Sequence, residues 1–196
     1  MLIDPLGLVL TSDHVVAGAN RIVVTLTDSR KFPGKTVGNN AQIDLALDRV
    51  KGEKFPVLLL GRSTGLRLGQ GVVVVGGGVR KDREVTLGTE NAIGSFVAYW
   101  EFMLVRVVHT DALIRRGYSG DPLVNMRGEM VGVVSYPRPT APGFAGLGIP
   151  IEAASSLRWG SLSAGQVSRG GRIQRLTPGG PATCVKASCR KTSSRM

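Results

Sequence analysis

Gly117-Tyr118-Ser119-Gly120-Asp121-Pro122 is the stretch of this sequence that decides its fold. The glycines beside Ser119 suit a tight turn whose backbone N–H groups converge on one point. A serine hydroxyl is a poor nucleophile at neutral pH, and it needs an imidazole to take its proton and a carboxylate to orient that imidazole. The sequence offers His14 and Asp44 upstream, in the order His, Asp, Ser. We therefore expect a nucleophilic serine site.

The surroundings of the two upstream residues leave alternatives open. Asp44 lies in an apolar segment, residues 43–47, where a buried carboxylate is costly unless a partner such as an imidazole N–H binds it. An aspartate at an exposed strand edge is the competing interpretation. His14 follows an apolar run, and a histidine in that setting, taken alone, is more often structural than catalytic.

The composition favours an all-β body. The chain of 196 residues contains 27 glycines and 10 prolines, and short runs rich in Val and Leu alternate with turn residues. We expect one helix, over residues 150–157, with proline in its first turn. The predicted strands are residues 8–11, 21–27, 31–37, 44–50, 57–60, 72–75, 84–87, 92–97, 101–108, 122–124, 130–135 and 146–149.

Charge and cysteine are concentrated near the end of the chain. All 14 Asp and Glu precede residue 156, whereas 8 of the 25 Lys and Arg follow it, within a net charge of +11. Such a basic segment is either a solvated extension or a tether for nucleic acid. Cys184 and Cys189 lack a second pair of ligands, so we expect no zinc site. We expect no secretory signal in these residues, because the N-terminus lacks a basic head followed by a long apolar stretch, and no apolar run is long enough to span a membrane.

The three segments resemble the HtrA/Deg family of serine proteases, and the likeness extends to their flanks over roughly residues 2 to 178. It rests on the segments Ile3–Thr11, Arg21–Asp28, Thr110–Ala112, Pro122–Asn125, Gly128–Val133 and Gly146–Ile151. The resemblance implies the chymotrypsin-like serine protease fold, with two six-stranded antiparallel β-barrels and a short C-terminal helix. It also implies cleavage of unfolded or misfolded proteins in protein quality control, without a metal or other cofactor.

Roles for individual residues follow from the resemblance. His14 would be the general base, Asp44 its orienting carboxylate and Ser119 the nucleophile that forms an acyl-enzyme. The turn Gly117, Tyr118 and Ser119 would form the oxyanion hole, with the N–H groups of Gly117 and Ser119 as donors. The primary specificity pocket would be lined by Leu147, Gly148 and Ile149. We expect it to take small or medium aliphatic side chains of the substrate.

Two positions of the serine turn depart from the family pattern. Tyr118 and Asp121 stand where the family has Asn and Gly. We expect the Tyr118 side chain at the mouth of the turn, where it would obstruct substrate. A negative charge about 7 Å from the oxyanion would cost about 2 kcal/mol, or roughly thirtyfold in rate, unless Arg115 or Arg116 screens it. The alternative function is therefore a catalytically impaired pseudoprotease that binds unfolded chains.

The resemblance also divides the chain. We expect a protease domain over residues 1–158 and a poorly ordered basic tail over residues 159–196, in which only Leu176-Thr177-Pro178 resembles the opening of a PDZ domain. Family members form trimers through a segment before the first strand of this chain, so the oligomeric state stays open. Unfolded proteins or peptides are the expected partners, with no specific nucleic acid. Relatives are often periplasmic or organellar, and the compartment of this chain is left unassigned.

Overall fold

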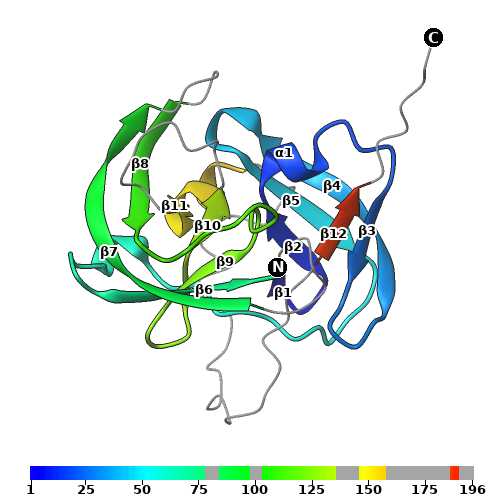
Figure 1. Ribbon diagram of the computed structural model, residues 1–196. Helices are drawn as coiled ribbons and strands as arrows, with labels where there is room; N and C mark the ends of the chain where they lie inside the picture. The colour runs from blue at the N-terminus through cyan, green and yellow to red at the C-terminus, as the bar shows by residue number, and fades with distance from the viewer. Residues whose placement is uncertain (78–83, 98–102, 136–145, 158–185, 190–196) are drawn as a thin grey trace.

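Two antiparallel β-sheets form the body of the protein (Figure 1). The computed structural model describes residues 1–77, 84–97, 103–135, 146–157 and 186–189. The first sheet is built from β1 (Leu2–Asp4), β2 (Leu8–Thr11), β3 (Ile22–Thr25), β4 (Lys31–Asn40), β5 (Leu45–Val50) and β12 (Lys186–Cys189). The second is built from β6 (Gly71–Gly76), β7 (Glu84–Val97), β8 (Met103–Thr110), β9 (Pro122–Asn125), β10 (Met130–Ser135) and β11 (Gly146–Pro150).

The second sheet is a closed barrel, whereas the first is an open sheet within the part of the chain that the structure describes. The barrel runs β10-β11-β8-β7-β6-β9, as expected for one six-stranded barrel. The first sheet has the strand order β1-β2-β5-β4-β3-β12, with β1 and β12 at its two ends. Closure requires the end strands to pair in register. The all-β architecture is thus confirmed, whereas the expectation of two closed barrels is met by the second sheet alone.

The helices of the described residues are all short. They are α1 (Asp13–Val16) and the 3₁₀ helices η1 (Ala41–Ile43), η2 (Ser63–Gly65) and η3 (Ile151–Ser156). The helix predicted over residues 150–157 is therefore present as the 3₁₀ helix η3, rather than as an α-helix. Within the described residues, no helix combines the length and the apolar character that crossing a bilayer would require.

Two sequence predictions about connections are revised. The segment Val57–Leu60 is not a ladder strand, because it lies between the two sheets: the Leu58 N–H donates to Leu2 O at 3.1 Å, and Leu60 forms an isolated bridge with Met130. Within the predicted tail, β12 pairs antiparallel with β3 and forms the end of the first sheet. The PDZ-like segment, residues 176–178, lies outside the described residues.

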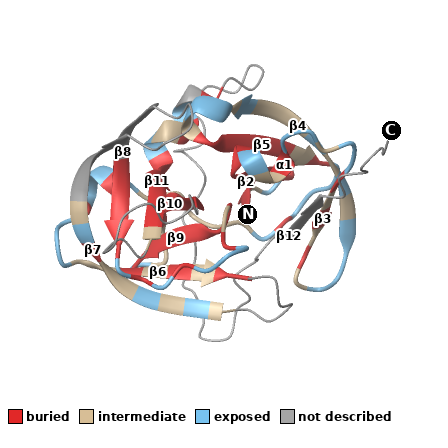
Figure 2. Cartoon of the chain, turned by 45° about the horizontal axis from the view of Figure 1, so that its top comes forward, coloured by how far each residue is buried: buried red, intermediate tan, exposed pale blue. Residues whose placement is uncertain are grey.

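Three apolar clusters hold the sheets together, and the central strands β5 and β10 each contribute to two of them. On β5, Leu45 and Leu47 face the cluster between the sheets, while Ala46 and Val50 face the interior of the first sheet. On β10, Val133 faces the cluster between the sheets and Val134 faces the barrel interior. Figure 2 shows β10 and β11 buried along their lengths. Strands buried on both faces leave little freedom to shift.

Asp48 is a carboxylate inside the first sheet. It lies on the same face of β5 as Ala46 and Val50, and it is completely buried. The Thr36 hydroxyl donates a hydrogen bond to Oδ1 at 2.7 Å, and Oδ2 is buried without a hydrogen-bond partner among the described residues. Burial raises the pKa of Asp48, although the bond from Thr36 opposes the rise.

We expect Asp48→Asn to stabilise the protein at neutral pH. A carboxyl group whose pKa is raised by folding stabilises most below its unfolded pKa, and the stability is lost as pH rises through the folded pKa. The amide can still accept the Thr36 hydrogen bond but never ionises. Thermal unfolding should show a higher midpoint for the variant at neutral pH, and little difference near about pH 4. The exposed Asp28→Asn is the control, and an equal gain from it would contradict the explanation.

Candidate active site

Asp44 is positioned by the end of the 3₁₀ helix η1, not by a strand. Its backbone is left-handed, with φ 51° and ψ 43°, and its N–H donates to Ala41 O at 3.2 Å. Aspartate is one of the few residues that tolerates this conformation, which is costly for most side chains. β5 begins at the next residue. The strand predicted over residues 44–50 therefore begins one residue later than expected. The Asp44 side chain is 6% exposed.

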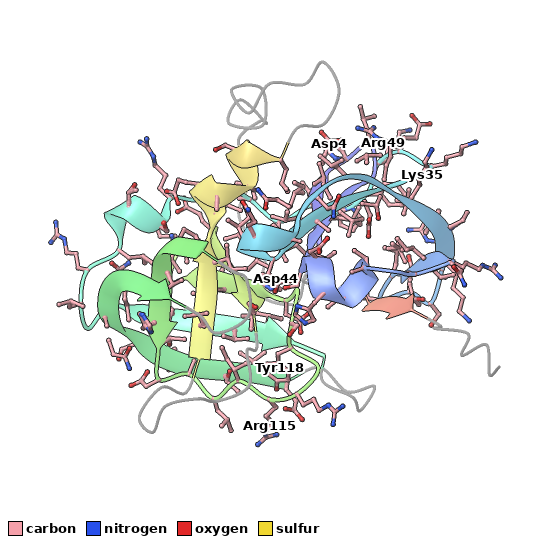
Figure 3. All side chains as sticks on the ribbon, turned by 90° about the horizontal axis from the view of Figure 1, so that it is seen from above. Asp4, Lys35, Asp44, Arg49, Arg115 and Tyr118 are labelled. Carbon is pink, nitrogen blue, oxygen red and sulfur yellow. The ribbon has the colours of Figure 1, made fainter. Side chains whose placement is uncertain are left out.

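The carboxylate of Asp44 is surrounded by donors, and the His14 ring is one of them. His14 Nδ1 lies 2.8 Å from both Oδ1 and Oδ2, and the His14 backbone N–H donates to Oδ1 at 2.9 Å. The Ser135 hydroxyl donates to Oδ2 at 2.7 Å. Figure 3 shows Asp44 beside α1, between the two sheets. The structure thus brings two of the predicted site residues together and adds Ser135, which the sequence analysis did not identify.

The environment of His14 favours its protonated form. The hydrogen bond to Asp44 raises the pKa of His14 above the ordinary 6.5, although partial burial opposes the rise. The charges of Asp44 and Asp13 add to the increase. The ring is 45% exposed, so the nitrogen away from Asp44 has access to its surroundings. Such an imidazole can accept a proton at Nε2 while Asp44 holds Nδ1–H.

The Ser119 turn lies against the chain segment that leads to His14. The Gly120 N–H donates to Val134 O at 2.8 Å, and the Ser12 hydroxyl reaches the same oxygen at 3.3 Å. Gly120 has φ +86°, and a Cβ there would overlap the Thr11 hydroxyl. Gly117 also has a positive φ, +100°. Both glycines are therefore required by backbone conformation, as the sequence predicted, and Gly120 also by the close approach of Thr11.

The Tyr118 side chain does not lie at the mouth of the turn, contrary to the sequence analysis. It is fully buried in the apolar cluster inside the barrel, and its hydroxyl donates to Glu84 Oε2. The prediction failed because it considered the neighbours of Tyr118 in sequence, not the barrel behind the turn. The Tyr118 N–H donates to Arg115 O at 3.1 Å, so it is used within the turn itself.

Asp121 has a hydrogen-bond donor in the backbone of Gly77. Its Oδ2 accepts a hydrogen bond from the Gly77 N–H at 3.2 Å, and the residue is 8% exposed. Arg115, which was expected to screen this charge, instead places Nη1 2.9 Å from Glu84 Oε2. The carboxylate expected to disturb an oxyanion therefore has a fixed donor of its own.

The segment predicted to line the specificity pocket is buried in β11. Ile149 is fully buried and packs, with Leu147, in the cluster between the sheets. A Cβ on Gly148 would lie 2.9 Å from Leu123 Cδ2, on the barrel side. His109 is also buried, opposite Leu147 on the neighbouring strand β8, and burial lowers the pKa of its ring.

The described residues contain no group of three or more His, Cys, Asp or Glu side chains arranged to hold a metal ion. They do hold a histidine–carboxylate pair, which is suited to proton transfer, and the residue after Ser119 contacts the segment that leads to this histidine.

We expect Asp44→Asn to lower the pKa of His14, because the hydrogen-bonded carboxylate is the main cause of its increase. Proton NMR titration of the two histidine rings measures this directly, with His109 as the internal reference. The stability that His14 gains from the carboxylate is largest below about pH 6.5 and is lost as pH rises through the folded pKa, so the variant should flatten that dependence. An unchanged His14 titration would contradict the role given to Asp44.

Comparisons with known proteins agree with this geometry. The family described as "Trypsin-like peptidase domain" matches residues 1–133. A putative serine protease HhoA from Synechocystis sp. is 40% identical over 168 residues, which are 84% of this chain and 42% of that protein. A probable periplasmic serine endoprotease DegP-like from Pseudomonas fluorescens is 38% identical over 166 residues, 84% of this chain and 34% of that protein.

Solved structures give the same result. The HtrA-type protease AlgW, solved with a decapeptide, matches with a TM-score of 0.72 and 30% identity over 79% of this chain and 48% of that chain. The chain spans about two fifths or less of the length of the two curated relatives. It belongs to the trypsin-like peptidases, and within them to the HtrA/Deg serine proteases.

Proposed function

We propose that this chain is a serine endopeptidase of HtrA/Deg type that acts through His14, Asp44 and Ser119. The observation that carries the proposal is the buried Asp44 carboxylate bound to His14 Nδ1 at 2.8 Å. The segment just before His14 packs against the residue that follows Ser119. The named serine proteases among its relatives support the same assignment.

The proposed mechanism gives each group one task. His14 Nε2 takes the proton from the Ser119 hydroxyl as its oxygen attacks the scissile carbonyl carbon, and Asp44 stabilises the imidazolium that forms. The tetrahedral oxyanion is stabilised by the N–H groups of Gly117 and Ser119. His14 then gives the proton to the leaving amine, and water hydrolyses the acyl-enzyme by the same route. Ser135 holds Asp44 in place throughout.

Extended, unfolded polypeptides are the proposed substrates. The described residues of β11, the segment Leu147, Gly148 and Ile149, carry no charge that would select a lysine or arginine side chain. A peptide would therefore be bound through its backbone and through small or medium aliphatic side chains. AlgW has been solved with peptides bound, which supports this substrate class for the present chain. A role in protein quality control is part of the same proposal.

The second candidate is a pseudoprotease that binds unfolded chains without cutting them. Its support was the pair of departures at Tyr118 and Asp121. Tyr118 is buried, so it does not obstruct the turn as the sequence suggested, and the charge of Asp121 is stabilised by the Gly77 N–H, which lessens its effect on an oxyanion. The observed geometry therefore favours the active enzyme.

We expect Ser119→Ala to lower the rate of cleavage of a reduced and alkylated protein by about a thousandfold or more, because it removes the nucleophile. Labelling by a fluorophosphonate should disappear in the same variant. The matched control is Ser155→Ala, an exposed serine bound to Glu152 O. For the wild type, the rate should rise with pH through a pKa above 6.5, as His14 loses its proton.

The outcome that contradicts the proposal is equally direct. A wild-type protein that binds the unfolded chain, does not cut it, and is labelled no better than Ser119→Ala would be a pseudoprotease. Cleavage that persists in Ser119→Ala would show that another residue is the nucleophile.

A further inference from the structure

Tyr118 and Asp121, the two residues of the serine turn that depart from the family pattern, both contact the same end of the β6–β7 strand pair. Gly76 is the last residue of β6 and pairs with Glu84, the first residue of β7. Tyr118 contacts both of them, and Asp121 accepts from the N–H of Gly77. Ser119 therefore lies between two attachments to the same end of the barrel.

The ring of Tyr118 crosses this strand pair. A Cβ at Gly76 would lie 2.9 Å from two carbons of the ring, so the absence of a side chain at Gly76 makes room for it. Beyond Gly76, the phenol hydroxyl reaches Glu84 Oε2. A fully buried hydroxyl needs a hydrogen-bond partner, and Glu84 supplies one that carries charge.

Glu84 binds the turn at a second point. The same Oε2 lies 2.9 Å from Arg115 Nη1, and Arg115 O accepts the Tyr118 N–H at 3.1 Å. The side chain and the backbone of the turn are thus joined into one closed network of three residues. Figure 3 shows Arg115 and Tyr118 close together at one edge of the barrel. The burial of the phenol and its bond to Glu84 raise the pKa of Tyr118 to about 12, so it stays a donor at any physiological pH.

We propose that Glu84 is a positioning residue for the oxyanion hole, and that it acts by holding Tyr118 and Arg115 on either side of Gly117. This inference rests on the proposed function. The N–H groups that stabilise an oxyanion must be oriented before reaction, and a turn with two positive-φ glycines has little rigidity of its own. The network supplies that rigidity from outside the turn.

The test compares kcat and KM for three variants. Glu84→Ala removes the acceptor and Tyr118→Phe removes the donor, so each should lower kcat about tenfold while KM changes by less than about twofold. The double variant should be no slower than Glu84→Ala, because that change alone already breaks the contacts of Glu84 with both Tyr118 and Arg115. Glu84→Gln keeps an acceptor oxygen and should recover part of the loss.

The matched control is Glu129→Ala. Glu129 has the same kind of surroundings, with Arg127 Nη2 at 2.8 Å and Asn125 Nδ2 at 2.9 Å, but it lies at the β9–β10 turn. It should keep the wild-type kcat. Circular dichroism verifies that each variant is folded, and Tyr118→Phe, which keeps the ring, covers the case in which Glu84→Ala unfolds.

A readout without catalysis separates this inference from the proposed function. In protein labelled with ¹³Cζ-tyrosine, the Tyr118 signal, identified by its loss in Tyr118→Phe, should shift in Glu84→Ala. The inference alone is overturned if the protein reacts with fluorophosphonate but its kcat is unchanged in Glu84→Ala and Tyr118→Phe. It is also overturned if Glu129→Ala lowers kcat by the same factor as these two variants. A wild-type protein that neither reacts nor cleaves, with a Tyr118 signal that still depends on Glu84, overturns the proposed function and leaves only a structural contact.

Discussion

The carboxyl end of β10 is the constraint on which the candidate site depends. Val134 O accepts hydrogen bonds from the Gly120 N–H and from the Ser12 hydroxyl, and Ser135 donates to Asp44. Asp44, the segment before His14 and the serine turn lie far apart in the sequence. They meet because each of them binds Val134 or Ser135. β10 is paired on both sides and buried on both faces, so it cannot move without disturbing the barrel and the cluster between the sheets.

Local chemistry was enough to predict the pairing of His14 and Asp44. A carboxylate among apolar residues needs a partner, and an imidazole was the fitting one in the sequence. Ser135 could not be found in the same way, because a serine that ends an apolar strand is equally at home in solvent. Its role arises from register: β10 must end beside η1 for its hydroxyl to reach Asp44. The left-handed backbone of Asp44 was hidden for a related reason, since the apolar pattern of residues 43–47 is also that of a strand.

The fold was predictable where hydrophobic patterning decides it, and less so at its edges. The sequence predicted a strand at the position of every barrel strand, although β7 is one continuous strand where two, residues 84–87 and 92–97, were predicted. Val57–Leu60 has the same composition, but its backbone bonds go to two different sheets, which no pattern in one segment reveals. The position of β12 beside β3 is a long-range pairing of a segment with no apolar signal. Whether a sheet closes depends on its two end strands, which are short in the first sheet.

The serine turn shows why a motif position constrains the backbone more tightly than the side chain. The two glycines are fixed by positive φ, and Gly120 also by a close contact, so no other residue fits without strain. At Tyr118 and Asp121 the side chains point toward the end of β6 and β7, and what fits there depends on the residues behind the turn. Tyr118 is accommodated because Gly76 leaves space for its ring and Glu84 accepts its hydroxyl. A large side chain beside a nucleophile therefore obstructs a site only if the fold offers it nowhere else to go, and here the barrel interior receives it.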